Sequence, residues 1–242
     1  VLLDYGAAIN IKTDSGMAVL NLVAANGNCM MAQLLLQRGA RTTIVDQNIQ
    51  CPLIYAAVAG HIEIVKLLLD RHADIAAEDK LGKTALIYAT EQGHVELIKL
   101  LLARGADIQH KDNKGQDVIM YVLQNPQIKQ LELIEILLAY GADIDAKDYN
   151  NESLLHKAAL GNDSALVNFL LHQGATCDFC YDDQDIAIEL KQLLRCARQA
   201  GLLMELKAVD WSTFVADDLG KIADFYAARM LRQGFSGTIA EQ

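Results

Sequence analysis

The sequence predicts an all-α solenoid in which short helix pairs stack side by side and projecting turns join them. One observation is a Gly-Ala dipeptide, once replaced by His-Ala, that recurs with spacings of 33, 33, 33, 36 and 33 residues. Self-similarity at such a period indicates a stacked repeat protein. A second is the 52% apolar content, which supplies a large core and excludes a disordered chain. The dipeptides are Gly6-Ala7, Gly39-Ala40, His72-Ala73, Gly105-Ala106, Gly141-Ala142 and Gly174-Ala175.

One repeat is clearest over residues 79–111, where the pattern predicts two helices and a turn. Thr84 is expected to cap the first helix, because a threonine oxygen accepts backbone N–H groups at a helix start. Gly93 is expected to end that helix, since glycine tolerates the left-handed backbone that helix ends often need. Apolar residues then recur at helical spacing until Gly105 ends the second helix: Val95, Leu97, Ile98, Leu101 and Leu102.

This unit resembles the ankyrin repeat, whose pattern is roughly D-x-x-G-x-T-P-L-H-x-A-A-x-x-G-H-x-E-I-V-K-L-L-L-x-x-G-A-D. Residues 51–57 (CPLIYAA) and 60–69 (GHIEIVKLLL) follow the pattern almost residue for residue. The resemblance covers residues 1–176, as one partial and five recognisable repeats. It implies an ankyrin-repeat solenoid with projecting hairpin-like turns, and a surface that binds another macromolecule without catalysis.

The departures from the pattern are local. The histidine of T-P-L-H survives only as His156, and apolar residues replace it in the other repeats. His72 stands where a turn glycine is usual, so it must tolerate a less favourable backbone. The fourth full repeat is three residues longer and contains Pro126. We expect this proline to stop the first helix and the added residues, within 124–128, to bulge between the two helices.

The repeat pattern fades in the C-terminal region, residues 177–242. Apolar spacing predicts helices over 186–199 and 212–232. Terminal repeats are atypical because they cover an open apolar face, so we expect a degenerate repeat and a helical cap here. The alternative is that these residues begin a second functional domain, with Trp211 at its start.

Composition restricts the classes of function. The net charge of −10 argues against a nonspecific nucleic-acid binder, which needs a basic face. Five irregularly spaced cysteines fit a reduced, cytoplasmic setting better than a disulfide framework. No apolar run approaches the roughly 20 residues that span a bilayer, so no membrane partner is expected. The chain starts mid-repeat without a methionine, and we expect it to be a fragment of a longer protein.

No catalytic, cofactor-binding or metal-binding residues are expected. The sequence contains no phosphate-binding glycine loop and no G-x-S-x-G motif. His61 and His94 occupy the G-H position of the pattern, where a structural role is favoured over an acid–base or metal role. Cys177 and Cys180 form a lone CxxC, for which unpaired thiols are favoured over a zinc or redox site.

The resemblance assigns partner binding to the turn tips and to the variable residues after A-A. Four lysines, at positions 80, 83, 111 and 114, fall on adjacent turns and predict a basic edge for an acidic partner. Solvated lysines that keep the protein soluble are the alternative. The candidate partner-binding residues are Lys80, Leu81, Lys83, Glu91, Gln92, Lys111, Asn113, Lys114, Gln116, Tyr149, Asn150 and Glu152.

Three tyrosines, Tyr55, Tyr88 and Tyr121, recur at intervals of 33 residues and should form a row on the first helices. An aromatic row available to a partner is one reading, because tyrosine is enriched at binding hot spots. Packing between repeats, with the hydroxyl groups at the rim, is the favoured one.

The sequence thus predicts a monomeric scaffold or adaptor that binds a protein partner through its concave face and turn tips, without a small-molecule substrate. The incomplete T-P-L-H motif and the low number of prolines, two in the whole chain, favour a bacterial, host-directed protein, which would act in the host cytosol. The alternative is the targeting module of a larger enzyme whose catalytic domain lies outside these residues.

Overall fold

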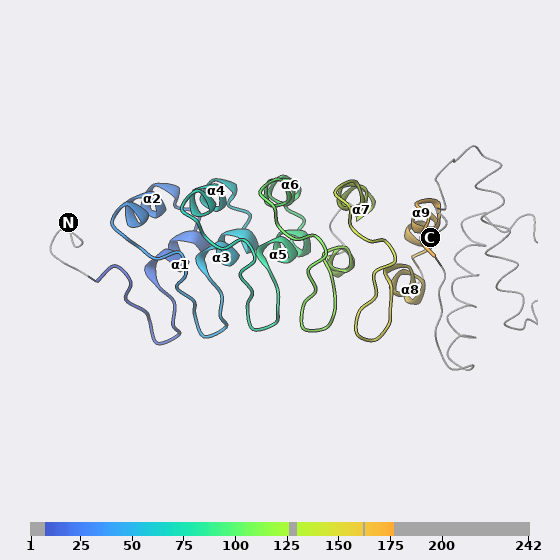
Figure 1. Ribbon diagram of the computed structural model, residues 1–242, viewed down its shortest axis with the longest axis horizontal. Coiled ribbons are helices and arrows are strands. Elements are labelled where there is room, and N and C mark those ends of the chain that lie inside the picture. Colours follow the sequence, from blue (N-terminus) through green and yellow to red (C-terminus); the bar gives the residue numbers. More distant parts are fainter. Residues whose placement is uncertain (1–7, 126–129, 162, 177–242) are drawn as a thin grey trace, which may run out of the picture.

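The computed structural model describes residues 8–125, 130–161 and 163–176, and it shows a stack of five helix pairs (Figure 1). In each pair the first helix lies in one row and the second helix in a parallel row, while long turns project on the other side of the first row. The pairs are α1 (Val19–Ala25) with α2 (Cys29–Gln37), α3 (Pro52–Val58) with α4 (Ile62–Asp70), α5 (Ala85–Glu91) with α6 (Val95–Ala103), η2 (Met120–Gln124) with α7 (Gln130–Ala139), and α8 (Leu154–Leu160) with α9 (Ser164–His172).

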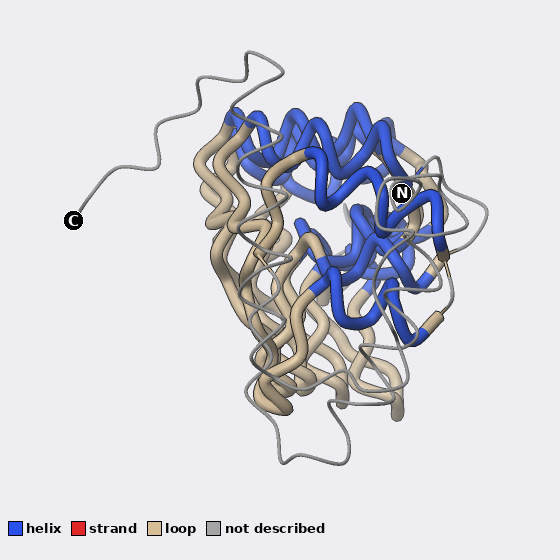
Figure 2. The backbone as a smooth tube through the Cα atoms, turned by 90° about the vertical axis from the view of Figure 1, so that its right-hand side faces the viewer, coloured by secondary structure: helices blue, strands red, loops and turns tan. Residues whose placement is uncertain are grey.

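The predicted all-α solenoid is confirmed. A view turned by 90° shows the projecting turns superimposed in one layer beside the two helix layers (Figure 2). Among the described residues, β-pairing is limited to isolated bridges between Lys12 and Ala18 and between Lys147 and Ser153. No helix in this part of the chain is both long enough and apolar enough to cross a bilayer.

Stacking buries equivalent residues of successive repeats in two columns. The first helices contribute one column and the second helices the other, and no member of either is more than 3% exposed. A helix pair this short cannot bury its apolar side alone, so each repeat depends on its neighbours for cover. The columns are Leu20, Leu53, Leu86, Ile119 and Leu155, and Leu35, Leu68, Leu101, Leu137 and Leu170.

The first helices begin mainly through their backbone, which corrects the expectation for Thr84. Thr84 is the N-cap of α5, but its side chain makes no capping hydrogen bond. Its extended backbone instead lets its carbonyl accept a hydrogen bond from the Tyr88 N–H at 3.2 Å. In α8 the cap is a side chain, because the hydroxyl of Ser153 accepts from the His156 N–H.

His61 and His94 precede the second helices and connect neighbouring repeats. The Nε2 atoms lie 3.1 and 3.2 Å from the carbonyl oxygens of Ala25 and Val58, in the repeat before. A Cβ atom built on Gly60 would lie 2.7 Å from the His94 ring, so the ring fills space that only glycine leaves free. This geometry agrees with the structural role expected for both histidines.

The fourth repeat departs from the others at its first helix. The segment η2 is a 3-10 helix, whereas an α-helix ended by Pro126 was expected. The residue before a proline is driven out of the helical region, and Asn125 accordingly has φ −123° and ψ 101°. The proline also cannot donate a hydrogen bond to this turn. The expected bulge falls largely on residues 126–129, which lie outside the described residues.

Two further sequence expectations concern the backbone and the C-terminus. His72 has φ 60°, which confirms that it adopts the left-handed backbone usual for glycine. Residues 177–242, with the predicted helices, the cap and the Cys177–Cys180 pair, lie outside the described residues. The division between repeats and cap therefore stays a prediction.

A comparison of two glycines tests the contact between histidine and glycine. We expect Gly39→Ala to lower the free energy of unfolding by about 1 kcal/mol, because its φ of +88° is unfavourable for alanine. No further loss is expected there, since nothing lies within 4 Å of the added Cβ. Gly60→Ala adds a collision with His94 and should cost about 1 kcal/mol more, since it also disturbs the bond to Val58. Urea denaturation measures both, and equal losses would argue against the ring contact.

Candidate functional site

The projecting turns are joined tip to tip by single backbone hydrogen bonds. Each bond runs from an N–H in one turn to a carbonyl oxygen in the turn before it. This ladder fixes the spacing and order of the tips, so side chains on successive tips form one surface. The bonds are Gln47 to Ser15 (3.2 Å), Lys80 to Asn48 (2.9 Å), Asn113 to Leu81 (3.0 Å) and Tyr149 to Lys114 (3.0 Å).

Each of the last four described turns is held by one aspartate. In the third repeat Asp79 Oδ1 accepts hydrogen bonds from the N–H groups of Leu81 (2.8 Å) and Lys83 (3.0 Å). The same pair of bonds, from the residues two and four positions later, occurs in the other three turns. A carboxylate that satisfies two turn amides keeps the hairpin closed. We call these residues, Asp46, Asp79, Asp112 and Asp148, the tip aspartates.

The second oxygen of each tip aspartate binds the first helix of the same repeat. The hydroxyl groups of Tyr55, Tyr88 and Tyr121 donate to Oδ2 of Asp46, Asp79 and Asp112 at 2.8, 2.6 and 2.6 Å. Burial, then the bond to the aspartate, raises the pKa of Tyr55 to about 12 and moves the other two pKa values upward as well.

These bonds add a second role to the tyrosine row. Tyr55 and Tyr88 pack against the core, and their hydroxyl groups hold the hairpins against the helices. Tyr121 is 1% exposed and offers no surface to a partner, while Tyr55 and Tyr88 are half-buried. The row therefore has a structural role in the described residues.

The fifth repeat uses a lysine in place of the tyrosine. Lys157 Nζ lies 2.8 Å from Asp148 Oδ2 and also pairs with Glu152. Burial opposes both charges, but the bond between them lowers the pKa of Asp148 and raises that of Lys157. The first described repeat has Thr13 and Leu22 at these positions, and so lacks an equivalent tie.

Lys83 is not part of an exposed basic edge, contrary to the sequence expectation. Its Nζ pairs with Glu91 Oε2 at 2.8 Å, and it lies 4.4 and 5.1 Å from the ring centres of Tyr121 and Tyr88. Its side chain is 12% exposed. The lysine follows the turn, at a position that faces the helices, and aromatic faces attract its charge there.

Several polar side chains of the concave floor, by which we mean the surface between the turns and the first helices, are bonded to one another. Gln50 Nε2 bonds to Asp79 and to the Tyr88 hydroxyl, at 3.4 and 3.2 Å. Glu91 is engaged by Lys83, and Gln116 and Glu152 are half-buried. Of the candidate residues on the helices, Gln92 is exposed.

The outermost residues of the turns are exposed. Lys80, Asn113, Lys114 and Asn150 face solvent, and Leu81 and Tyr149 are 55% and 74% exposed. Asn113 also uses its side-chain amide to donate to the Lys80 carbonyl. Lys111 is exposed at the base of its hairpin, and its Nζ donates to the carbonyl of Lys147 at 2.7 Å. The structure therefore brings most of the tip candidates together and separates Lys83 and Glu91 from them.

Sequence reasoning missed Ile49 as a tip residue of interest. Ile49 has φ 63°, a conformation that costs a β-branched residue roughly 1–2 kcal/mol. Glycine or asparagine occupies the equivalent place in the other turns, as Gly16, Gly82, Gly115 and Asn151. Aligning the turns at the 33-residue period would have singled out this exception. The same alignment would have found the tip aspartates, nine residues before each tyrosine.

Asp117 is a buried carboxylate outside this surface. It is 1% exposed, and its Oδ2 has no hydrogen-bond partner, while Oδ1 accepts weakly from the Met120 N–H at 3.4 Å. Burial raises its pKa to about 6. The equivalent residues in neighbouring repeats are Thr84 and Ser153, which carry no charge.

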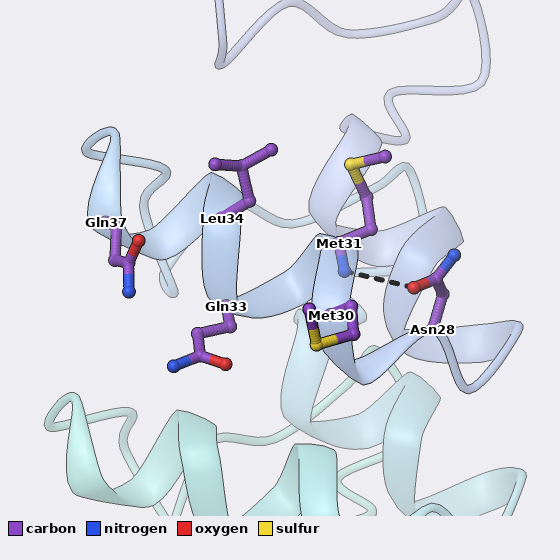
Figure 3. A pocket seen from close by; sticks show the side chains of 6 residues that line it. All are labelled: Asn28, Met30, Met31, Gln33, Leu34 and Gln37. Carbon is purple, nitrogen blue, oxygen red and sulfur yellow. Dashed lines mark hydrogen bonds between the residues drawn. The ribbon is translucent and has the colours of Figure 1, made fainter.

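A shallow apolar depression lies on α2 (Figure 3). Met31 and Leu34 point away from the following repeat, and Asn28 accepts a hydrogen bond from the Met31 N–H. Met31 is 40% exposed, although its equivalents Ile64 and Leu97 are buried between repeats. We interpret the depression as the stacking side of the first described repeat. It is lined by Asn28, Met30, Met31, Gln33, Leu34 and Gln37.

Comparisons with known proteins agree with the fold. A family model described as ankyrin repeats (3 copies) matches residues 1–79, 20–112 and 74–148. A second model, described as ankyrin repeats (many copies), matches residues 128–171. No curated protein matches the chain. Within the described ranges, no group of three or more histidine, cysteine, aspartate or glutamate residues has the arrangement of a metal site.

Removing one tyrosine hydroxyl tests the tie to the tip aspartate. We expect Tyr55→Phe to lower the free energy of unfolding by about 1–2 kcal/mol at pH 8, because Asp46 loses a hydrogen bond. Folding raises the pKa of Tyr55 from 10.0 to about 12, so its contribution is complete below pH 10 and is lost between pH 10 and 12.

The stabilities of Tyr55→Phe and the original chain should therefore converge as the pH rises from 10 to 12. Urea denaturation followed by circular dichroism measures both. Tyr149→Phe is the matched control, because its ring is 74% exposed. A constant difference between Tyr55→Phe and the original chain from pH 8 to 12 would contradict the bond.

The unpartnered Oδ2 atom of the buried Asp117 predicts a variant that is more stable than the original chain. Folding raises the pKa of Asp117 from 3.8 to about 6, so stability that is complete below pH 4 is lost as the pH rises to 6. Asp117→Ser, which copies Ser153, should raise the free energy of unfolding by about 1–3 kcal/mol at pH 8. The gain should fall at pH 4. A gain that is the same at both values would mean that the charge is not its source.

Proposed function

This chain belongs to the ankyrin repeat family, whose repeats are general protein–protein interaction modules, and we propose that it is a scaffold or adaptor that binds a protein partner through its tip surface. The tip surface comprises residues 47–49, 80–82, 113–115 and 149–151. The observation that supports this choice is the contrast between exposed tips and an internally bonded concave floor.

Polar groups that are already bonded are poor sources of binding energy. A partner that approached the floor would have to replace the bonds of Lys83 with Glu91 and of Gln50 with Tyr88. Each replacement leaves a buried group to satisfy again, which offsets most of the gain. The tip side chains carry no such penalty, because Leu81 and Tyr149 already face water. Gln92 and other exposed residues at the rim of the floor would form the edge of the contact.

Charge indicates the kind of partner. The tip surface carries Lys80 and Lys114 and no carboxylate, the adjoining first described turn carries one, Asp14, and the chain as a whole has a net charge of −10. Opposite charge on the partner would increase the association rate and select orientation. We therefore propose an acidic patch on the partner where the tips bind. The host-directed bacterial origin and the cytosolic setting stay predictions from the sequence.

Reversing the tip charges tests the proposal. Affinity capture from cell lysate identifies a partner, which is then purified and titrated against the chain. We expect the double variant Lys80→Glu/Lys114→Glu to bind at least about tenfold more weakly at low salt, because four units of charge change at the contact. The difference should shrink as the ionic strength rises.

A double variant of equal charge change provides the control. Lys66→Glu/Lys99→Glu alters two lysines of the outer helices, whose surface ion pairs with Glu63 and Glu96 add little stability. Equal binding by the two double variants would move the site away from the tips. Failure to capture any partner would count against the scaffold itself.

A further inference from the structure

Ile49 occupies a turn position at which the other described turns have glycine or asparagine. Its φ of 63° is matched by 80°, 74° and 75° at Gly16, Gly82 and Gly115, and by 64° at Asn151. Branching at Cβ makes this region unfavourable for isoleucine. The N–H of Ile49 bonds to the Asp46 carbonyl at 3.2 Å, so the closed turn maintains the conformation.

Packing does not account for isoleucine at this place. The side chain is 46% exposed on a projecting turn, and it is not among the apolar side chains that pack against the core. An apolar side chain that stays half in water contributes little to the core, and glycine would close the same turn without strain. A strained residue with no structural gain is the kind of outlier from which a function is inferred.

The tip ladder places other exposed apolar groups along the same row. Asn48, beside Ile49, accepts a hydrogen bond from the Lys80 N–H, and Leu81 follows directly. The Leu81 carbonyl in turn accepts a hydrogen bond from the Asn113 N–H, and the Lys114 carbonyl accepts one from the Tyr149 N–H. Read along the tips, the row presents isoleucine, lysine, leucine, lysine and tyrosine. Apolar groups thus alternate with positive charges.

We propose that Ile49 determines specificity in partner binding, and that with Leu81 and Tyr149 it holds a protein segment in which apolar residues alternate with carboxylates. This inference rests on the proposed function and adds the chemistry of the bound segment. The apolar side chains of the segment cover Ile49 and Leu81, and its carboxylates face Lys80 and Lys114. Binding buries the exposed part of Ile49, which the fold leaves open.

A displayed library of random 16-residue peptides is a suitable probe, because it assumes no particular partner. We expect selection on this chain to enrich peptides with leucine, isoleucine or phenylalanine and with aspartate or glutamate. An enriched peptide is then synthesised and titrated against the variants. Enrichment of basic peptides would overturn the proposed chemistry.

Ile49→Gly should move stability and binding in opposite directions. Relief of the backbone strain should raise the urea midpoint of unfolding, whereas loss of the side chain should weaken the selected peptide about tenfold. A merely structural residue would not separate the two measurements in this way. Unchanged peptide binding by Ile49→Gly would overturn the inference and leave the scaffold function standing, whereas no enrichment at all would count against both.

His72→Gly is the matched control, because it removes a left-handed non-glycine residue outside the tip surface without removing an apolar group. It should leave the affinity within about twofold. Leu81→Asn, which copies Asn48 and Asn150, should weaken binding without relieving strain. Vesicles of phosphatidylcholine with phosphatidylserine form a second probe. Binding to these vesicles in place of peptides would overturn the inference in favour of a membrane surface.

Discussion

A carboxylate that makes two separate sets of hydrogen bonds holds each of the last four described repeats in shape. One oxygen of the tip aspartate closes the hairpin by accepting two backbone amides, and the other fixes that hairpin to the first helix. Without the second bond a hairpin would be connected to the helix layers mainly through its two ends. The orientation of the projecting turns therefore depends on one side chain per repeat. The tip surface and the ladder between turns both follow from it.

The same interaction explains why tyrosine and lysine replace one another at this position. Both are long side chains that end in a donor, and both reach the free oxygen of the aspartate from nine residues away. Tyrosine brings a ring that also attracts Lys83, so the middle repeats build a cation between two aromatic faces. Lysine brings a charge and recruits Glu152. The consequence is a concave floor whose polar groups are bonded to one another along several repeats.

Periodicity allowed the solenoid and the helix pairs to be predicted, because both depend on a pattern that recurs about every 33 residues, and the resemblance to the ankyrin repeat indicated the exposed tips. The inward position of Lys83 could not be predicted from the sequence, because Lys83 and Lys80 both fall in the same turn segment. Only the path of the hairpin backbone directs the Lys83 side chain toward the helices. The capping bond expected of Thr84 failed for a similar reason, as the backbone alone starts the helix. The 3-10 form of η2 depends on how tightly the chain must turn before Pro126, which no local propensity specifies.

The fourth repeat has a consequence for how the stack comes apart. Its first helix is a short 3-10 segment and its buried Asp117 lacks a partner for one oxygen, so it adds less cohesion than the repeats on either side. In a linear array each unit is coupled only to its neighbours, so opening starts where the coupling is weakest and not at the ends alone. Under load or mild denaturant the array would divide at this joint, and the blocks on either side would melt as separate cooperative units.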